Sequence, residues 1–348
     1  MTAYITTSNM GALTQISMLR LQDRLSKAQG ELASGRLADV GISLGSQQGE
    51  SVSLRQTLDE LNAFTMSNAV VSTRLAATQS ALTSIATTGS GFSSTLMTAL
   101  STGTSATVLQ QSANQALAAV TDVLNTSTAG SYLFAGENTS AKPIQAFDQT
   151  PPSAAQQALV TAFQSAFGVA IGSAGANAIT PNQMQQFLEN QFAAEFNDTN
   201  WKANWSVADD QVMQSQVSSS QSVSTSVSAN DQSFRDIASA SSMLAGLGIE
   251  ALNADTRQTL IGAAARKLQT GLTGVTGLQS SVGLTQQTVD ESGARTTQES
   301  NFLSSRVSDL ESVDPARLAI EINGLKTQLE TTYSLTAQLQ NLNLVKYL

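Results

Sequence analysis

The sequence predicts a mainly α-helical protein, in which the N- and C-terminal parts form an elongated coiled-coil bundle of long helices with a small α+β domain inserted between them. Three observations predict this fold. Aliphatic residues recur with gaps of three and four near both ends of the chain, as in the seam of a coiled coil. Only 12% of the 348 residues are charged, about half the share in an average domain. Both tryptophans and six of the eleven phenylalanines lie between residues 138 and 230.

The composition excludes several kinds of functional site. The chain contains no cysteine and no histidine, which excludes disulfides, thiolate nucleophiles, histidine bases and zinc sites built from these residues. The net charge of −9 argues against nucleic acid as the main partner, because positive charge binds the phosphate backbone. No apolar run approaches the roughly 20 residues that span a bilayer, and the first residues lack the pattern of a secretory signal. We therefore expect no cofactor, no metal and no membrane insertion.

The first predicted helix begins after Ser8 or Asn9, either of which can cap it, and ends near Ser34 and Gly35. A seam of apolar residues runs along it: Met18, Leu21, Leu25, Ala28 and Leu32. Residues 40–49 contain three glycines and are predicted to form an irregular connector.

Two further helices are predicted before the insertion. The apolar spacing of a coiled coil indicates a long helix over about 51–88. The Gly-Ser-Gly sequence at 89–91 and Gly103 are expected to bound a shorter helical piece, because glycine weakens a helix. A third helix is predicted over 105–126.

The character of the sequence changes after Gly130. Residues 131–136 (Ser-Tyr-Leu-Phe-Ala-Gly) predict a short strand, and four of the five prolines follow in the inserted region. Within that region we expect two helices, at 154–171 and 181–196, and a hairpin formed by 212–219 and 222–228. Trp201 and Trp205 are predicted to lie in the core of this domain rather than to form a binding platform.

The long-helix pattern returns after the insertion. One helix is predicted around 234–244, and Asp255 can cap a second that runs to about residue 310. At 1.5 Å per residue the second helix is roughly 80 Å long, too long for the core of a globular domain. Asp314 and Pro315 are a start signal for the last helix.

Two other features favour structural interpretations. The glycine-rich stretch at 271–277 lacks the Lys-Ser/Thr of a phosphate-binding loop and is predicted to allow close helix packing. Arg20, Arg24 and Lys27 share one face of the first helix. They can pair with acidic residues of the last helix: Glu321 or Glu330.

The two terminal helices carry apolar seams that cannot be buried by one helix alone, and isolated helices are marginal in water. They must pair with each other or with other subunits, so we predict that their apolar residues form an assembly interface. These residues are Leu13, Ile16, Leu21, Leu25, Leu32, Leu318, Ile322, Leu325, Leu329, Leu335, Leu339 and Leu342. The predicted domains are the terminal assembly helices (1–45 and 311–348), a helical rod domain (46–137 and 231–310) and an inserted surface domain (138–230).

Several stretches resemble the bacterial flagellin superfamily. Residues 32–36 (Leu-Ala-Ser-Gly-Arg) are similar to the Leu-Ser-Ser-Gly-Lys/Arg stretch that closes the first flagellin helix. Residues 309–316 (Asp-Leu-Glu-Ser-Val-Asp-Pro-Ala) resemble the C-terminal region of the family. Within the superfamily, residues 132–136 (Tyr-Leu-Phe-Ala-Gly) and the ending Tyr347-Leu348 resemble the hook-filament junction proteins (hook-associated protein 3). The Asp-Asp-Ala-Ala-Gly-Leu stretch of flagellins is replaced by Val-Gly-Ile-Ser-Leu-Gly at 40–45.

The resemblance implies a structural protein of the bacterial flagellum, without catalytic activity, that joins hook to filament. Such proteins are exported unfolded through the flagellar type III apparatus without a cleavable signal, and an export chaperone holds the C-terminal helix. Outside the cell the terminal helices assemble with other copies of the chain in a ring or helix. Hook-associated protein 1 and flagellin are the implied axial neighbours.

Other functions stay open at this point. Flagellin itself, the filament subunit, shares the terminal helices and polymerises alone. A signalling coiled coil, like the cytoplasmic hairpin of chemoreceptors, is also rich in Ala, Ser, Gln and Glu. The aromatic-rich insertion and the lack of a transmembrane segment argue against that signalling function. An enzyme in the inserted domain would have to work without histidine or cysteine.

Overall fold

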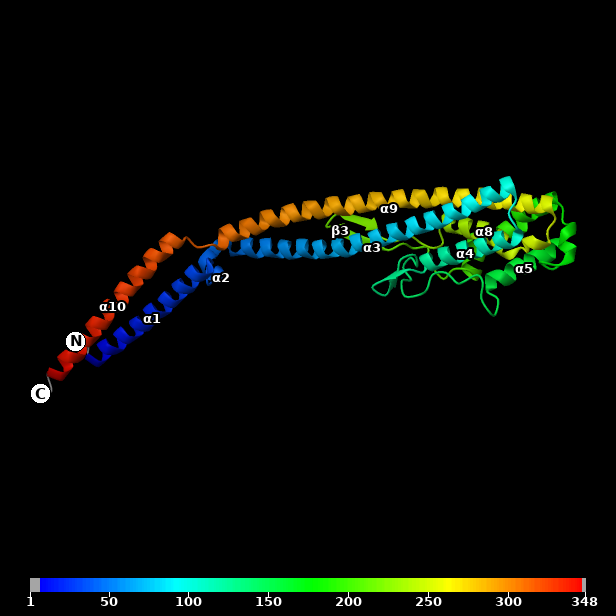
Figure 1. Ribbon diagram of the computed structural model, residues 1–348. Helices are drawn as coiled ribbons and strands as arrows, with labels where there is room; N and C mark the ends of the chain where they lie inside the picture. The colour runs from blue at the N-terminus through cyan, green and yellow to red at the C-terminus, as the bar shows by residue number, and fades with distance from the viewer. Residues whose placement is uncertain (1–6, 346–348) are drawn as a thin grey trace. The chain divides into compact units, whose positions relative to one another are not determined.

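The computed structural model describes the backbone of residues 7–345 and the side chains of residues 11–338. The helices are α1 (Thr7–Ser34), α2 (Val40–Leu44), α3 (Gln48–Thr102), α4 (Ala106–Leu124), α5 (Ala154–Phe167), α6 (Pro181–Phe187), α7 (Asp198–Asn204), α8 (Gln232–Gly246), α9 (Ala254–Glu311) and α10 (Pro315–Val345). The strands form two antiparallel hairpins, β1 (Ser127–Thr128) with β2 (Ser131–Tyr132) and β3 (Gln214–Ser218) with β4 (Gln221–Ser224). The mainly α-helical class with a small α+β insertion is confirmed (Figure 1).

The chain separates into two compact units. The terminal unit consists of Met1–Asn62 and Thr297–Leu348, and the central unit of Ala63–Thr296. The long helices α3 and α9 contribute residues to both units. The predicted division into terminal, rod and inserted domains at residues 138 and 230 stays a prediction.

Helix α3 continues without a break to Thr102, so the predicted interruption at residues 89–91 is wrong. A Cβ atom on Gly89 would lie 2.6 Å from the Leu272 side chain of α9. Gly89 therefore makes room for a neighbouring helix instead of ending its own. Glycine costs a helix about 1 kcal/mol relative to alanine, but tertiary packing supplies most helical stability in a protein.

The connector at residues 40–49 is more regular than predicted, because it contains the helical turn α2. The carboxylate of Asp39 accepts a hydrogen bond from the backbone amide of Ile42 at 3.0 Å. This side-chain cap satisfies an amide that has no partner within such a short helix.

The core of the central unit joins the long helices to the inserted residues. Apolar side chains of α4, α8 and α9 form one continuous buried cluster with the aromatic rings of the insertion. Trp201 stacks on Trp205 with ring centroids 5.2 Å apart, and Trp205 stacks on Phe147 at 5.3 Å. Both tryptophans are at most 2% exposed, which confirms that they are core residues.

Val217 of β3 connects the hairpin of β3 and β4 to two long helices. The side chain of Val217 is fully buried. Its backbone oxygen accepts hydrogen bonds from Asn68 Nδ2 of α3 at 3.0 Å and from Ser292 Oγ of α9 at 2.9 Å. The predicted hairpin is therefore confirmed, and its position is fixed by polar side chains from both helices.

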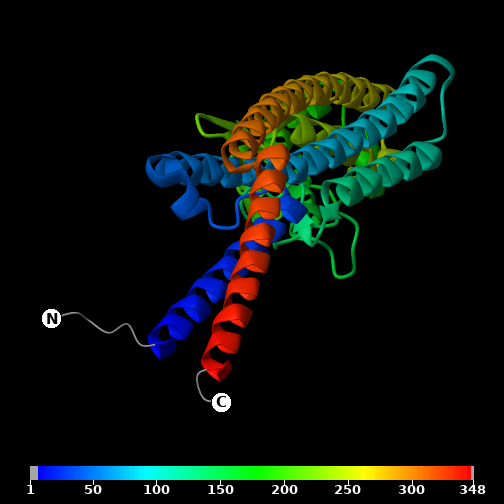
Figure 2. The same ribbon diagram turned by 90° about the vertical axis from the view of Figure 1, so that its left-hand side faces the viewer.

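In the terminal unit, α1 and α10 run side by side in opposite directions, as Figures 1 and 2 both show. We call this pair the terminal hairpin. Asp314 caps α10, since its carboxylate accepts hydrogen bonds from the backbone amides of Ala316 at 2.9 Å and Arg317 at 3.2 Å. Pro315 is the first helical residue. The predicted start of the last helix is confirmed.

Candidate assembly surface

The inner seam of the terminal hairpin is formed by apolar residues from both helices. Ala28 of α1 and Leu318, Ile322 and Leu325 of α10 are each less than 10% exposed. Half-buried side chains pack against this cluster: Leu21, Leu25 and Val313. Each helix thus buries these apolar residues of the other helix. A single amphipathic helix could not bury them alone.

The predicted assembly residues fall into groups by exposure. Those that face the partner helix within the chain are Leu21, Leu25, Leu318, Ile322 and Leu325. Leu329 is half-buried. Four stay exposed: Leu13 (64%), Ile16 (48%), Leu32 (40%) and Leu335 (51%). The side chains of Leu339 and Leu342 lie outside the described residues.

Sequence reasoning missed Leu19, which is 53% exposed on α1. It lies outside the coiled-coil seam but follows Leu13 and Ile16 at gaps of three residues. This second periodicity is the signal that could have revealed it. We call Leu19 and the four exposed predicted residues the exposed set; four of its members lie on α1 and Leu335 lies on α10. Large apolar residues that stay exposed are candidates for an interaction surface.

Polar contacts also cross the terminal hairpin. Arg24 pairs with Glu321 at 3.1 Å, one of the pairings that the sequence predicts. Gln22 Nε2 donates a hydrogen bond to the hydroxyl of Tyr333 at 2.8 Å. Because the Arg24 side chain is 63% exposed, its ion pair contributes only about 0–1 kcal/mol. These contacts match the register of the two helices and contribute little to the stability of the terminal hairpin.

A buried carboxylate lies where α9 ends. The side chain of Glu311 is 0% exposed and forms ion pairs with Arg36 and Arg55. Its Oε1 atom also accepts hydrogen bonds from Ser51 Oγ and Arg55 Nε, both at 2.8 Å. Hydrogen bonds from Arg55 above all, and then from Arg36 and Ser51, lower the pKa of Glu311 to about 2 against the opposing effect of burial. The carboxylate is therefore charged at neutral pH.

The backbone around Glu311 is paired as well. The amide of Leu37 donates to the carbonyl oxygen of Glu311 at 2.9 Å, and the amide of Val313 donates to that of Gly35 at 3.1 Å. Arg36 and Ser312 accordingly form an antiparallel bridge. The segment that follows α1 is thus tied by its backbone to the segment that follows α9.

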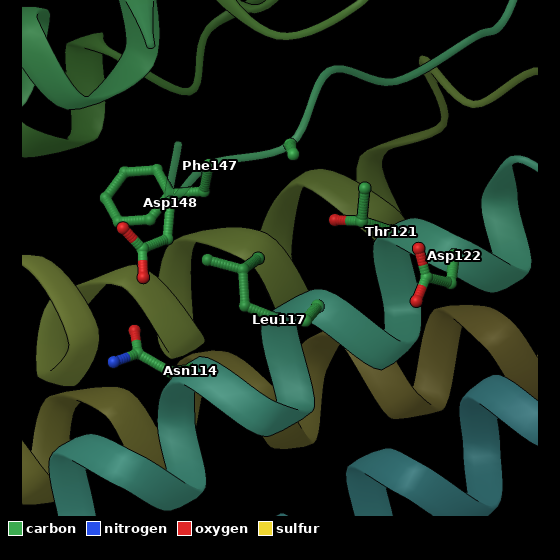
Figure 3. Close-up of a pocket in the computed structure, with 8 residues that line it drawn as sticks. Asn114, Leu117, Thr121, Asp122, Phe147 and Asp148 are labelled. Carbon is green, nitrogen blue, oxygen red and sulfur yellow. The ribbon is translucent and has the colours of Figure 1, made fainter. Parts of the chain in front are cut away.

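A small pocket in the central unit offers little chemistry. It has a volume of about 80 Å³ and lies between α4 and residues 146–148. Figure 3 shows the carboxylates of Asp122 and Asp148 on opposite sides of it, with Leu117 between them. Among the described residues, no group of three or more His, Cys, Asp or Glu side chains is placed to hold a metal ion. None of the helices that the structure describes combines the length and apolar character needed to cross a bilayer.

Two family models match the sequence. The bacterial flagellin N-terminal helical region matches residues 5–139, and the bacterial flagellin C-terminal helical region matches residues 265–348. The chain belongs to the flagellin superfamily. This confirms the resemblance seen in the sequence and gives the chain a structural role in the bacterial flagellum. The flagellin superfamily is not a family of enzymes.

Solved structures are similar to this flagellin-superfamily chain. A Vibrio parahaemolyticus protein described as a flagellar hook-associated protein matches with a TM-score of 0.52 and 9% identity, over 76% of this chain and 97% of that chain. Bacillus cereus FlgL matches with a TM-score of 0.49 and 11% identity, over 73% of this chain and 98% of that chain. No curated protein matches the sequence.

Proposed function

We propose that this chain is the hook-filament junction protein of a bacterial flagellum, a FlgL-type structural subunit that joins hook to filament. The observation that carries the proposal is the terminal hairpin. Its inner seam is covered within the chain, while the exposed set stays uncovered. Covering apolar surface contributes about 25 cal/mol per Å², so a neighbouring copy that packs on the exposed set stabilises the assembly.

The predicted interface residues then have two roles. The five seam residues that face each other build the terminal hairpin and keep it rigid: Leu21, Leu25, Leu318, Ile322 and Leu325. The exposed residues contact neighbouring copies: Leu13, Ile16, Leu32 and Leu335.

One short feature favours a junction protein over a filament flagellin, the Tyr-Leu-Phe-Ala-Gly sequence at 132–136. Within it, Phe134 is fully buried and packs edge-on against Phe234 of α8 with ring centroids 5.7 Å apart. The stretch that precedes the predicted insertion is thus packed against α8, which suits a subunit whose insertion must keep a defined place.

The proposed route to assembly is type III export without a cleavable signal, followed by packing outside the cell. The partners are other copies of the chain, hook-associated protein 1 on the hook side and flagellin on the filament side. An export chaperone holds the C-terminal helix beforehand. The apolar seam of α10 gives a physical reason for such a chaperone, since Leu318, Ile322 and Leu325 are covered by α1 in the folded chain and uncovered apolar residues promote aggregation.

Deletion of the gene in a flagellated host tests the proposal. Electron microscopy of the cells and gels of the culture medium are the readouts. The junction role predicts intact hooks without filaments and flagellin shed into the medium. Missing or short filaments without shed flagellin would favour a filament subunit instead, and normal flagella would exclude both.

A further inference from the structure

Helix α10 contains the only asparagine of the sequence that is followed directly by glycine, the pair Asn323 and Gly324. Both residues are exposed. They stand between two buried residues of the inner seam, Ile322 (6% exposed) and Leu325 (3% exposed). A chemically labile pair therefore lies within the part of α10 that packs against α1.

The lability comes from glycine, which has no Cβ atom to hinder an attack by its backbone nitrogen on the preceding side chain. The nitrogen of Gly324 forms a bond to Cγ of Asn323, and the amide nitrogen of that side chain leaves as ammonia, with the proton of the Gly324 amide. One water then opens the cyclic succinimide. Hydrolysis at one carbonyl gives aspartate, and hydrolysis at the other gives isoaspartate, in which the main chain runs through the former side chain.

The helical backbone of α10 opposes this ring closure. The amide of Gly324 is used in the hydrogen-bond ladder of the helix, and the carbonyl oxygen of Asn323 also accepts a hydrogen bond from Thr327 Oγ1 at 3.0 Å. The amide nitrogen reaches the Asn323 side chain only when Asn323 leaves its helical dihedral angles. Deamidation at this position is therefore coupled to the unwinding of α10.

Gly324 also makes unwinding easier, because glycine destabilises a helix by about 1 kcal/mol relative to alanine. A Cβ atom at this position would meet nothing within 4 Å. Packing against the described residues thus does not require a glycine here, in contrast to Gly274 of α9, where a Cβ would lie 2.1 Å from Ser233 Oγ.

An isoaspartate at position 323 would add a methylene group to the main chain between Ile322 and Leu325. These two residues share one face only while the helix keeps its regular spacing of residues per turn. The inserted backbone atom turns one of them away from that face, and the new carboxylate adds a negative charge beside the seam. The modified chain cannot present both residues to α1.

We propose that Asn323 is a deamidation site that is closed while α10 is helical and open while it is unwound, and that the isoaspartate product interrupts α10 within its seam. A subunit whose α10 stays unwound is thereby withdrawn from assembly, a consequence that rests on the assembly role proposed above. The site itself does not depend on that role, so the experiments use the purified full chain and give the same answer for any place in the flagellum.

Peptide mapping by mass spectrometry tests the site. The full chain is incubated in mildly alkaline buffer with urea, and trypsin then releases Asn323 in the peptide 318–326 and Asn301, which precedes Phe302, in the peptide 296–306. We expect conversion of the amide to an acid at Asn323, with isoaspartate confirmed by an isoaspartyl methyltransferase, and about tenfold slower conversion at Asn301. The matched control Gly324→Ala, which fits the space, is expected to slow Asn323 to a similar rate. Equal rates at the two asparagines, or no effect of Gly324→Ala, would refute the site.

The coupling to the helix is tested by replacing urea with trifluoroethanol, which enriches helical structure and whose effect circular dichroism follows. Conversion at Asn323 is expected to fall several-fold, whereas an unchanged rate would show that the helix does not close the site. Hydrogen exchange of a partly converted sample in the same solvent tests the product, because chromatography separates the modified and unmodified peptides 318–326. The modified peptide is expected to exchange faster, and equal exchange would contradict an interruption of α10.

Discussion

Arg36 and Glu311 are 275 residues apart in the sequence and form an ion pair where α1 and α9 end. The backbone beside them is paired too, through Leu37 and Val313. The two stretches through which the sequence most resembles the flagellin superfamily, 32–36 and 309–316, therefore meet in space. Their polar groups hold the base of the terminal hairpin.

Replacing Glu311 by Gln is expected to lower the free energy of unfolding of the terminal unit at neutral pH by about 1–3 kcal/mol, because charge-assisted hydrogen bonds are lost. Urea denaturation followed by circular dichroism measures this change. The control is Glu321→Gln, whose side chain is 46% exposed and whose loss is expected to cost no more than about 1 kcal/mol. Equal effects of the two variants would contradict the stabilising role of Glu311.

Because the pKa of Glu311 is lowered in the folded protein, we expect the free energy of unfolding to depend on pH. The pKa of Glu311 is lowered from 4.5 to about 2, chiefly by hydrogen bonds from Arg55. A carboxyl whose pKa is lower in the folded protein contributes stability above its unfolded pKa, and loses it as the pH falls through the folded value. The difference in stability between wild type and Glu311→Gln should therefore shrink as the pH falls from 4.5 to about 2. A constant difference across this range would show that the charge of Glu311 is not responsible.

Substitution of Leu325 by Ala tests whether this residue belongs to the buried seam of the terminal hairpin. It is 3% exposed against α1, so Leu325→Ala is expected to destabilise the hairpin by about 2–4 kcal/mol. Hydrogen exchange should become faster in α1 and α10 and stay unchanged in the central unit. The control is Ile320→Ala on the same helix, since Ile320 is 74% exposed and its loss should change stability by about 0.5 kcal/mol or less. Similar exchange in both variants would refute the assigned seam.

Substitution of Gly274 by Val tests the close packing of α8 on α9. A Cβ atom there would lie 2.1 Å from Ser233 Oγ, whereas a Cβ on Gly277 would meet nothing within 4 Å. The predicted role of the glycine-rich stretch in helix packing is thus confirmed at Gly274 and does not extend to Gly277. Gly274→Val should destabilise the central unit by about 1–3 kcal/mol, and Gly277→Ala should be neutral or stabilising by about 1 kcal/mol. Thermal unfolding measures both, and equal effects would contradict the packing.

The sequence predicts those parts of the fold that depend on a repeated spacing of apolar residues or on a local signal such as a helix cap. The start of α10 follows from Asp314 and Pro315, and the buried pair Trp201 and Trp205 follows from the local enrichment in aromatic residues. The break expected at residues 89–91 was wrong, because local propensity does not include the contact that Gly89 makes with another helix.

The candidate surface was only partly predictable for the same reason. Periodicity identifies an apolar seam, but it does not say whether a helix of the same chain or another copy covers it. Leu21 and Leu32 therefore belong to the same seam in the sequence and differ in the structure, where Leu21 packs in the hairpin and Leu32 stays exposed. The ion pairs of Glu311 were not predictable, because Arg36 and Arg55 come from segments that only the fold brings close to it.

Complementation of the gene-deletion strain tests the central claim most directly. The chain would be supplied as wild type, as a variant with Leu13, Ile16 and Leu335 replaced by Gln, or as the control Val160→Gln. Val160 is 41% exposed on α5 of the central unit. We predict filaments with wild type and control, and bare hooks with shed flagellin for the triple variant, whose purified form keeps its helical signal. Full-length filaments from the triple variant would contradict the claim that the exposed set forms the assembly surface.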